Sequence, residues 1–139
     1  MSIEPYLFFE GRCEEAIAFY RQALGAEVTM LMRNSESPEP PPPGMLPAGS
    51  ENKIMHAALN IGGSVLMASD GMCSGQPQFQ GIYLSLAVTD EAEARAKFTA
   101  LAKKGEVRMP LARTFFSPSF GMVTDQFGVS WMIIVPQEA

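Results

Sequence analysis

The chain has 139 residues, a formal net charge of −5 and a pI near 4.8, and 47% of its residues are hydrophobic. This size suits one domain, or two half-domains that share a core. Lysine and arginine are scattered along an acidic chain, which excludes the basic surface that a nucleic-acid partner requires. The N-terminus lacks the basic residues of a signal peptide and no apolar run reaches the roughly 18 residues of a membrane span, so we expect a cytoplasmic protein with no membrane partner.

The first half of the chain predicts one helix and four strands. Apolar side chains at spacings of three and four over residues 14–24 predict an amphipathic helix, with Gly25 after it as the C-cap. Gly62-Gly63 separates two runs with strand character and predicts a tight hairpin. The proline-rich stretch 37–49 cannot join a sheet, because prolines lack the N–H that a ladder needs, so we expect a mobile loop. The predicted strands are 3–9, 26–33, 53–61 and 64–69.

The second half of the chain repeats this order. Asp90 is predicted to cap a helix that ends near Lys103, and Phe127-Gly128 is predicted as the turn of the last hairpin. The predicted strands are 82–88, 106–111, 120–124 and 129–135.

The two halves also share residues at fixed spacing, which indicates an internal duplication. Glu14, Phe19, Ala23 and Glu27-Val28-x-Met30 return as Glu93, Phe98, Ala102 and Glu106-Val107-x-Met109, 79 residues later (98 − 19). Gly63-x-x-x-Met67 returns as Gly128-x-x-x-Met132, 65 residues later (128 − 63). The change in spacing matches the size of the proline-rich stretch. We therefore predict an α+β fold of two βαβββ modules, about 1–70 and 81–139, within a single domain, 1–139.

Strand alternation assigns each side chain of the predicted sheets to one of two faces. Counted outward from Gly62-Gly63, Ala58 should lie opposite Met67 and His56 opposite Ser69. One face is wholly apolar and should cover the helices, with Trp131 on it. The other face is mixed, as in a sheet that lines a pocket; it holds Tyr6, His56, Ala58, Asn60, Val65, Met67 and Ser69 in the first module, and Tyr83, Ser130, Met132 and Ile134 in the second.

Three segments carry a resemblance to a known family. They are PYLFFEGRCEEAIAFYRQALGAEV, KIMHAALNIGGSVLMASD and GMVTDQFGVSWMI. In this order they resemble the PhnB-like branch of the vicinal oxygen chelate superfamily, the glyoxalase and bleomycin-resistance fold. The resemblance implies two βαβββ modules curled around a cavity, usually in a homodimer.

Enzymes of that superfamily bind a divalent metal ion through side chains of the first and last strands of each module, commonly His or Gln with Glu. Carried over onto this sequence, those positions fall near Glu4 to Tyr6 and on Met67, Tyr83 and Met132. Glu4 is the one hard ligand among them, and one carboxylate does not hold a hard divalent ion against water. The resemblance therefore implies that the usual metal site is missing, and we expect no cofactor. Some PhnB-like chains are described as resembling a demethylubiquinone methyltransferase, but the nearest candidate here for a cofactor-binding glycine loop is the Gly62-Gly63 turn.

His56 is the only histidine, so proton transfer near neutral pH would fall to it, although it could equally hold a structural hydrogen bond with Ser69. Tyr6 and Tyr83 could orient a ligand by a hydrogen bond from an apolar wall, or serve packing alone. Glu4 could act as a base if it were buried, or be a surface charge near the terminus.

Other candidates have weaker support. Met67 and Met132 could adapt to varied apolar ligands or fill gaps in the packing. Cys73 has no base adjacent in sequence, and with Cys13 it suits reduced thiols better than a disulfide. Arg33 could meet an anionic ligand, but an ordinary solvated arginine is the default interpretation.

Three hypotheses for function follow. The first is a metal-independent small-molecule binding protein that uses His56, Asn60, Tyr83 and the two methionines, with Tyr6 beside them. The second is an enzyme, either a lyase, isomerase or transferase with a non-standard metal site at Glu4 and His56, or an acid–base catalyst at His56. The third is an interaction module whose proline-rich loop binds an aromatic groove on a partner, although that loop could also be a lid.

Overall fold

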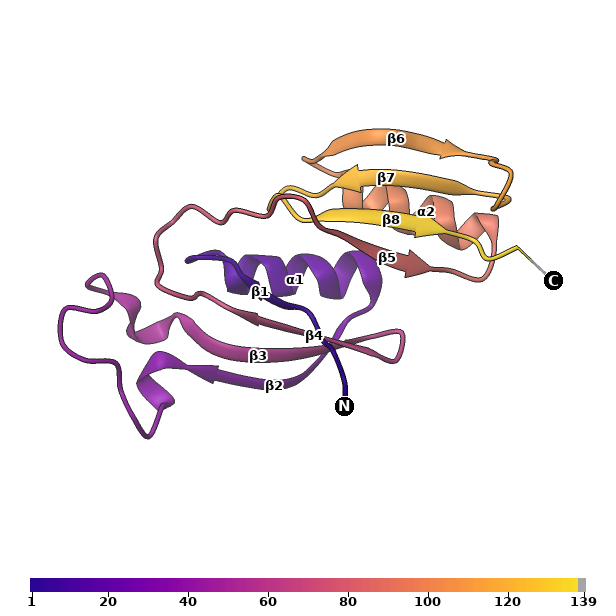
Figure 1. Cartoon of the computed structure of the whole chain (residues 1–139). Coiled ribbons are helices and arrows are strands. Elements are labelled where there is room, and N and C mark those ends of the chain that lie inside the picture. Colours follow the sequence, from indigo (N-terminus) through magenta and orange to yellow (C-terminus); the bar gives the residue numbers. More distant parts are fainter. Residues whose placement is uncertain (138–139) are drawn as a thin grey trace. The chain divides into compact units, whose positions relative to one another are not determined.

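Each half of the sequence folds as a four-stranded sheet with one helix on it (Figure 1). The computed structural model describes residues 1–137. Its two units are Met1–Pro77 and Gln78–Ala139, and both have the order β-α-β-β-β. The predicted α+β fold of two βαβββ modules is confirmed; that the two units form one domain stays a prediction.

The first unit has the strand order β1-β4-β3-β2, in which β1 runs parallel to β4 and the other pairs are antiparallel. Short 3-10 helices, η1 (Asn34–Glu36) and η2 (Ser50–Asn52), stand at the two ends of the proline-rich loop. The other elements are β1 (Tyr6–Phe8), α1 (Cys13–Leu24), β2 (Glu27–Arg33), β3 (Ile54–Ile61) and β4 (Ser64–Ser69).

Helix α1 covers one face of this sheet with its apolar side, on which Ala16, Ile17 and Tyr20 are buried. The helix ends as predicted at Gly25, whose φ of 69° is left-handed and whose N–H donates to the carbonyls of Arg21 and Tyr20. The sheet residues under the helix are equally buried, and they are Leu7, Phe9, Ala57, Leu59, Leu66 and Ala68.

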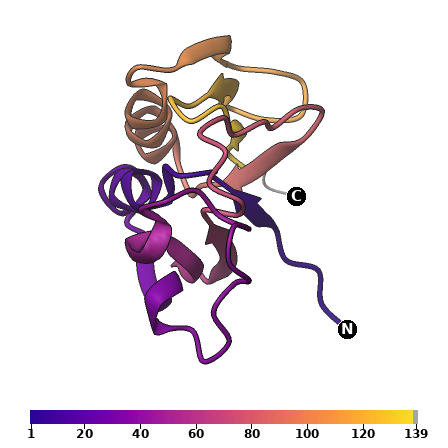
Figure 2. The same cartoon turned by 90° about the vertical axis from the view of Figure 1, so that its left-hand side faces the viewer.

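The second unit repeats the arrangement with the strand order β5-β8-β7-β6. Asp90 caps its helix as predicted, because its carboxylate accepts the N–H of Glu93 at 2.8 Å. Trp131 is buried, as are Val123 and Ile133. In the turned view of Figure 2, each helix lies beside the sheet of its own unit. The elements are β5 (Tyr83–Ala87), α2 (Glu91–Ala102), β6 (Glu106–Ala112), β7 (Phe120–Thr124) and β8 (Ser130–Ile134).

The predicted strands differ from the structure most clearly at the first strand and at one end of the hairpin between β3 and β4. The first strand is shorter than 3–9, because Ile3 is 94% exposed and Pro5 offers only its carbonyl, which accepts the N–H of Met67. The hairpin turn at Gly62-Gly63 is confirmed, with φ angles of 58° and 92°, and so is Ala58 opposite Met67.

The predicted pairing of His56 with Ser69 is wrong. The ladder between β3 and β4 ends at Ala57 and Ala68, and beyond it the Asp70 N–H donates to the carbonyl of Ile54. Strand β3 therefore has an extra residue at this point, as in a β-bulge, which strand alternation cannot anticipate.

None of the helices within residues 1–137 is long and apolar enough to cross a membrane.

Candidate functional site

The face of the first sheet that is turned away from α1 carries the predicted site residues, and we call it the open face. Met67 is half-buried there, between Leu66 and Ala68, which are buried under the helix. One row across the four strands follows from the registers, and it consists of Tyr6, Met67, Ala58 and Met30. Met67 is therefore on the side that the sequence predicts, within a row that is largely apolar.

Tyr6 and His56 form the polar centre of the open face. The phenol oxygen of Tyr6 lies 2.8 Å from Nδ1 of His56, and the centres of the two rings are 5.4 Å apart. Phe8 lies beside Tyr6 with its ring centre at 5.1 Å, and Met32 is opposite His56 on β2. Among the described residues, Nε2 of His56 makes no hydrogen bond. The only imidazole of the chain thus presents one nitrogen for a further partner.

The Tyr6 phenol stays protonated at neutral pH. Partial burial raises its pKa above the ordinary value of 10.0, and a side-chain hydrogen bond with Ser69 opposes this rise without cancelling it. A neutral phenol can donate one hydrogen bond and can also accept one, so Tyr6 suits either tautomer of His56.

Asn60 and Glu4 are less available than the sequence suggests. The side-chain oxygen of Asn60 accepts the N–H of Gly63 at 2.8 Å, so it stabilises the hairpin turn. Glu4 is exposed and lies before β1, outside the strand. A ligand-binding role for Asn60 and a basic or metal-binding role for Glu4 stay predictions.

Tyr83 and Met132 lie on the corresponding face of the second sheet. Tyr83 is opposite Ser130 and is 38% exposed, while Met132 is half-buried between the buried Trp131 and Ile133. The registers place Met132 opposite Met122, which in turn is opposite Met109. The second unit therefore has a methionine-rich face without an imidazole.

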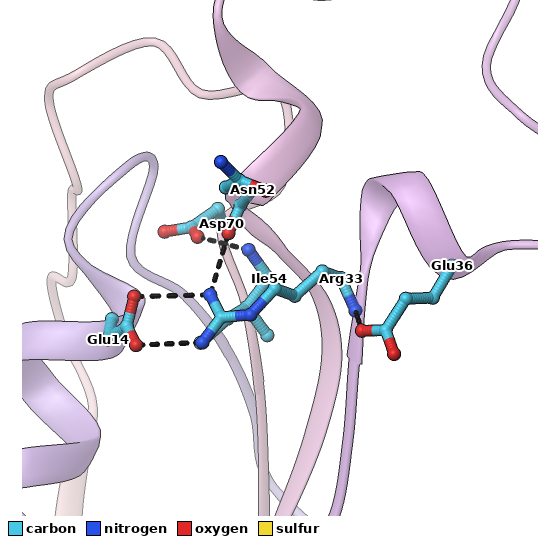
Figure 3. A network of polar contacts seen from close by, with 6 residues as sticks. All are labelled: Glu14, Arg33, Glu36, Asn52, Ile54 and Asp70. Atoms are coloured by element: carbon cyan, nitrogen blue, oxygen red, sulfur yellow. Dashed lines mark hydrogen bonds and ion pairs between the residues drawn. The ribbon is translucent and has the colours of Figure 1, made fainter.

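Arg33 is committed to the structure of the first unit (Figure 3). Its guanidinium donates to both carboxylate oxygens of Glu14, at 3.1 and 2.8 Å, and to the carbonyl of Asn52 at 2.7 Å. The bidentate pair ties the end of β2 to the first turn of α1 and to η2. The arginine is thus not a free partner for an anionic ligand.

This ion pair predicts a pH dependence of stability. The hydrogen bond from Arg33 lowers the pKa of Glu14 below its ordinary value of 4.5. A lowered folded-state pKa gives stabilisation that is present above the unfolded value and is lost as the pH falls through the folded value. We expect Glu14→Gln to lower the urea midpoint slightly near neutral pH, and the difference from wild type to disappear in acid. Glu15→Gln, which loses one 3.4 Å contact with Arg12, is the control and should show a smaller difference.

Sequence reasoning missed two buried carboxylates, Asp70 and Asp125. Asp70 is 1% exposed and accepts the backbone N–H groups of Gly11, Cys13 and Ile54 at 3.0, 2.8 and 2.7 Å. Asp125 is 3% exposed and accepts the indole N–H of Trp131 at 3.0 Å. Each follows directly after a strand, β4 or β7, and that position was the available signal. Both carboxylates are buried and stabilise the fold.

Comparison with known proteins places the chain in a family. A sequence model described as 3-demethylubiquinone-9 3-methyltransferase matches residues 1–134. The chain is 39% identical over 145 residues to Protein YjdN of Escherichia coli (strain K12), with 99% of this chain and 97% of that protein covered. A putative PhnB protein from Bacillus cereus is 29% identical, with a TM-score of 0.78 over 97% of this chain and 99% of that one. The chain belongs to the PhnB-like branch of the vicinal oxygen chelate superfamily.

Other solved structures support the fold of this PhnB-like chain. Protein PA1353 from Pseudomonas aeruginosa is 42% identical, with a TM-score of 0.84 and 99% of each chain covered. The fosfomycin resistance protein FosX from Listeria monocytogenes is 9% identical, with a TM-score of 0.68 over 99% of this chain and 94% of that one. The likeness to FosX shows the fold alone.

The divalent metal ion of the vicinal oxygen chelate superfamily does not fit the residues of this member. On the first and last strands of the two modules, the open faces offer phenols, thioethers, hydroxyls and apolar groups, from Tyr6, Phe8, Met67, Ser69, Tyr83, Ser85, Ser130 and Met132. Hard divalent ions such as Mg²⁺ prefer carboxylate and other oxygen ligands, and Zn²⁺ prefers thiolate, imidazole or carboxylate. Within residues 1–137, no group of three or more His, Cys, Asp or Glu side chains could hold a metal ion.

The cysteines of this PhnB-like chain are not activated nucleophiles. Burial is the main cause that raises the pKa of Cys13 to about 12, and the nearby carboxylates of Asp70 and Glu14 add to the rise. Partial burial also raises the pKa of Cys73, although a side-chain hydrogen bond with Ser50 acts against it. Both thiols are free and stay protonated at neutral pH, and a thiol is a much weaker nucleophile than a thiolate.

Proposed function

We propose that the open face of the first unit binds a small, partly apolar molecule without a divalent metal ion. The observation that carries the proposal is the 2.8 Å hydrogen bond between Tyr6 and Nδ1 of His56, on a face otherwise lined by methionine and aromatic side chains. Flexible thioethers and aromatic rings accept varied apolar shapes, and a few fixed polar groups give orientation. The proposal keeps Tyr83 and Met132 as ligand-binding candidates on the second unit.

The hydrogen bond also indicates what kind of group the ligand offers. In the proposed arrangement the phenol of Tyr6 donates to Nδ1 of His56, which places the ring proton on Nε2. Nε2 makes no hydrogen bond among the described residues and is then a donor. A ligand with a carbonyl or carboxylate oxygen next to an apolar body suits this arrangement.

The proposal extends to a homodimer, as the resemblance to the family implies, and to a cytoplasmic location, as we expect from the sequence. Light scattering on the purified protein tests the dimer.

A second candidate is an acid–base catalyst at His56. The Tyr6–His56 pair favours it, because a phenol that holds one ring nitrogen fixes the imidazole in one orientation and one tautomer. Such an enzyme would protonate an oxygen atom of its substrate from Nε2 while Nδ1 takes the phenol proton of Tyr6, so that the imidazole stays neutral and the phenol becomes a phenolate. Turnover of a bound carbonyl compound, lost in His56→Gln, would distinguish it from a binding protein.

The experiment is a thermal-shift screen of small carbonyl and carboxylate compounds on protein treated with a chelator. Stabilising compounds should lose about five- to tenfold in affinity in His56→Ala, since a half-buried hydrogen bond is worth roughly 1–1.5 kcal/mol. Tyr6→Phe should lose less, because the imidazole remains and only its tautomer is released. The matched control is Tyr83→Phe, which removes a phenol from the second unit. Hits that bind both variants as tightly as wild type would contradict the proposal.

A further inference from the structure

The proline-rich loop lines a cavity of its own, which is open to solvent. Residues 34–51 surround about 290 Å³, between η1 and η2. Asn34 closes the loop, because its side-chain amide donates to the carbonyl of Ser50 at 2.9 Å and its backbone N–H donates to that of Lys53 at 2.9 Å. The Ser50 hydroxyl donates to the carbonyl of Pro47 at 2.6 Å. These bonds build the cavity from the first unit alone.

Part of the cavity wall has no backbone N–H to donate. Four of the residues around it are prolines, Pro40, Pro41, Pro42 and Pro47, which have carbonyl groups but no N–H. The amide of Asn34 and the hydroxyl of Ser50 already donate within the loop. Apolar walls come from the proline rings, Leu46 and Ala48, and a carboxylate comes from Glu51.

The charge of the loop has one sign. Residues 34–52 include Glu36, Glu39 and Glu51 and no lysine or arginine. The two cations at its ends are directed elsewhere, since Arg33 pairs with Glu14 and the Lys53 ammonium donates to the carbonyl of Gly11 at 2.8 Å. In the part of the chain that the structure describes, Glu51 forms no ion pair.

We propose that this cavity binds a small organic ammonium ion with an apolar body. Among the described residues, the carbonyls of Pro40 and Pro41 and the carboxylate of Glu51 accept no hydrogen bond, so the N–H groups of an ammonium can donate to them while its apolar body covers the proline rings. The volume lies just below the usual range for ligand sites, roughly 300–1,000 Å³, so one ring with a short aminoalkyl chain fits. This site is distinct from the open face and does not depend on the function proposed for it.

The test compares three probes of one shape. They are 2-phenylethylammonium, the neutral 2-phenylethanol and the anionic 3-phenylpropionate, titrated by ligand-observed NMR at low salt. We expect the ammonium probe to bind most tightly and the anion not to bind. Glu51→Gln should weaken the ammonium probe about fivefold, the upper range for one exposed charge pair. Equal binding of the alcohol and the ammonium would overturn the proposal.

Two variants locate the probe. Glu39→Gln removes the same charge from the same loop at a residue that does not line the cavity, so it should change the affinity by less than half as much as Glu51→Gln. His56→Ala should leave the affinity unchanged. A loss of affinity in His56→Ala would put the probe on the open face. An equal loss in the two glutamate variants would mean that the negative charge of the whole loop attracts the probe, without a specific contact to Glu51. Either result would refute a site in the cavity.

Discussion

Asp70→Ala should lower the free energy of unfolding by about 3–5 kcal/mol, the largest effect that we expect from one substitution. The carboxylate is buried, and its loss leaves the N–H groups of Gly11, Cys13 and Ile54 without their acceptor. Cys13 is the first residue of α1, and Arg12 gives no side-chain cap, so Asp70 also caps this helix end by accepting the N–H of Cys13. Urea unfolding followed by far-ultraviolet circular dichroism measures the loss.

Asp90→Ala is the matched control for that experiment. Asp90 caps α2 with one hydrogen bond from an exposed position, so its removal should cost about 1 kcal/mol. The contrast between the two aspartates separates burial from helix capping. Equal losses in the two variants would mean that the three bonds of Asp70 contribute no more than one exposed cap.

Asp125→Ala should destabilise the second unit by about 2–4 kcal/mol. Its carboxylate accepts the N–H groups of Phe127 and Val129 at 2.9 and 3.1 Å, and so closes the turn between β7 and β8. It also accepts the indole N–H of Trp131, which is buried. Trp131 is the only tryptophan, so its fluorescence during urea unfolding reports on this unit directly.

A double-mutant cycle with Trp131→Phe tests the mechanism. The phenylalanine keeps an aromatic ring and removes the indole donor, so part of the cost of Asp125→Ala should disappear in the Trp131→Phe background. Circular dichroism replaces fluorescence for these variants. Strict additivity of the two substitutions would show that the bond between Asp125 and Trp131 does not contribute to stability.

The fold followed from local patterns because each pattern has its own physical cause. Gly25 could be predicted as a C-cap since glycine adopts a left-handed φ without strain, and Asp90 as an N-cap since its carboxylate reaches the third N–H of the helix. The duplicated spacing then gave two modules. Strand alternation placed Met67 and Met132 on the sheet faces that are turned away from the helices, as the burial of their neighbours confirms.

The rest depends on contacts that no local pattern encodes. His56 was predicted opposite Ser69, but the irregular end of the β3–β4 ladder and the length of the Tyr6 side chain bring His56 to Tyr6 instead. Asp70 binds backbone groups up to 59 residues away in sequence, so its role appears only after the fold is closed. The proline-rich loop was predicted outside the sheet, and it is, but its cavity depends on bonds of Asn34 and Ser50 that proline content does not predict.

The central claim is that Tyr6 holds His56 ready for a ligand on a face without a divalent metal ion. Nitrogen NMR of the ring of His56, the only histidine, tests it most directly in chelator-treated protein labelled at that residue. The account predicts one tautomer protonated at Nε2, a change of the Nε2 signal when a stabilising carbonyl or carboxylate compound is added, and no change with Mn²⁺ or Zn²⁺. A ring protonated at Nδ1, or a Zn²⁺ titration that saturates at one ion per chain through His56, would contradict it.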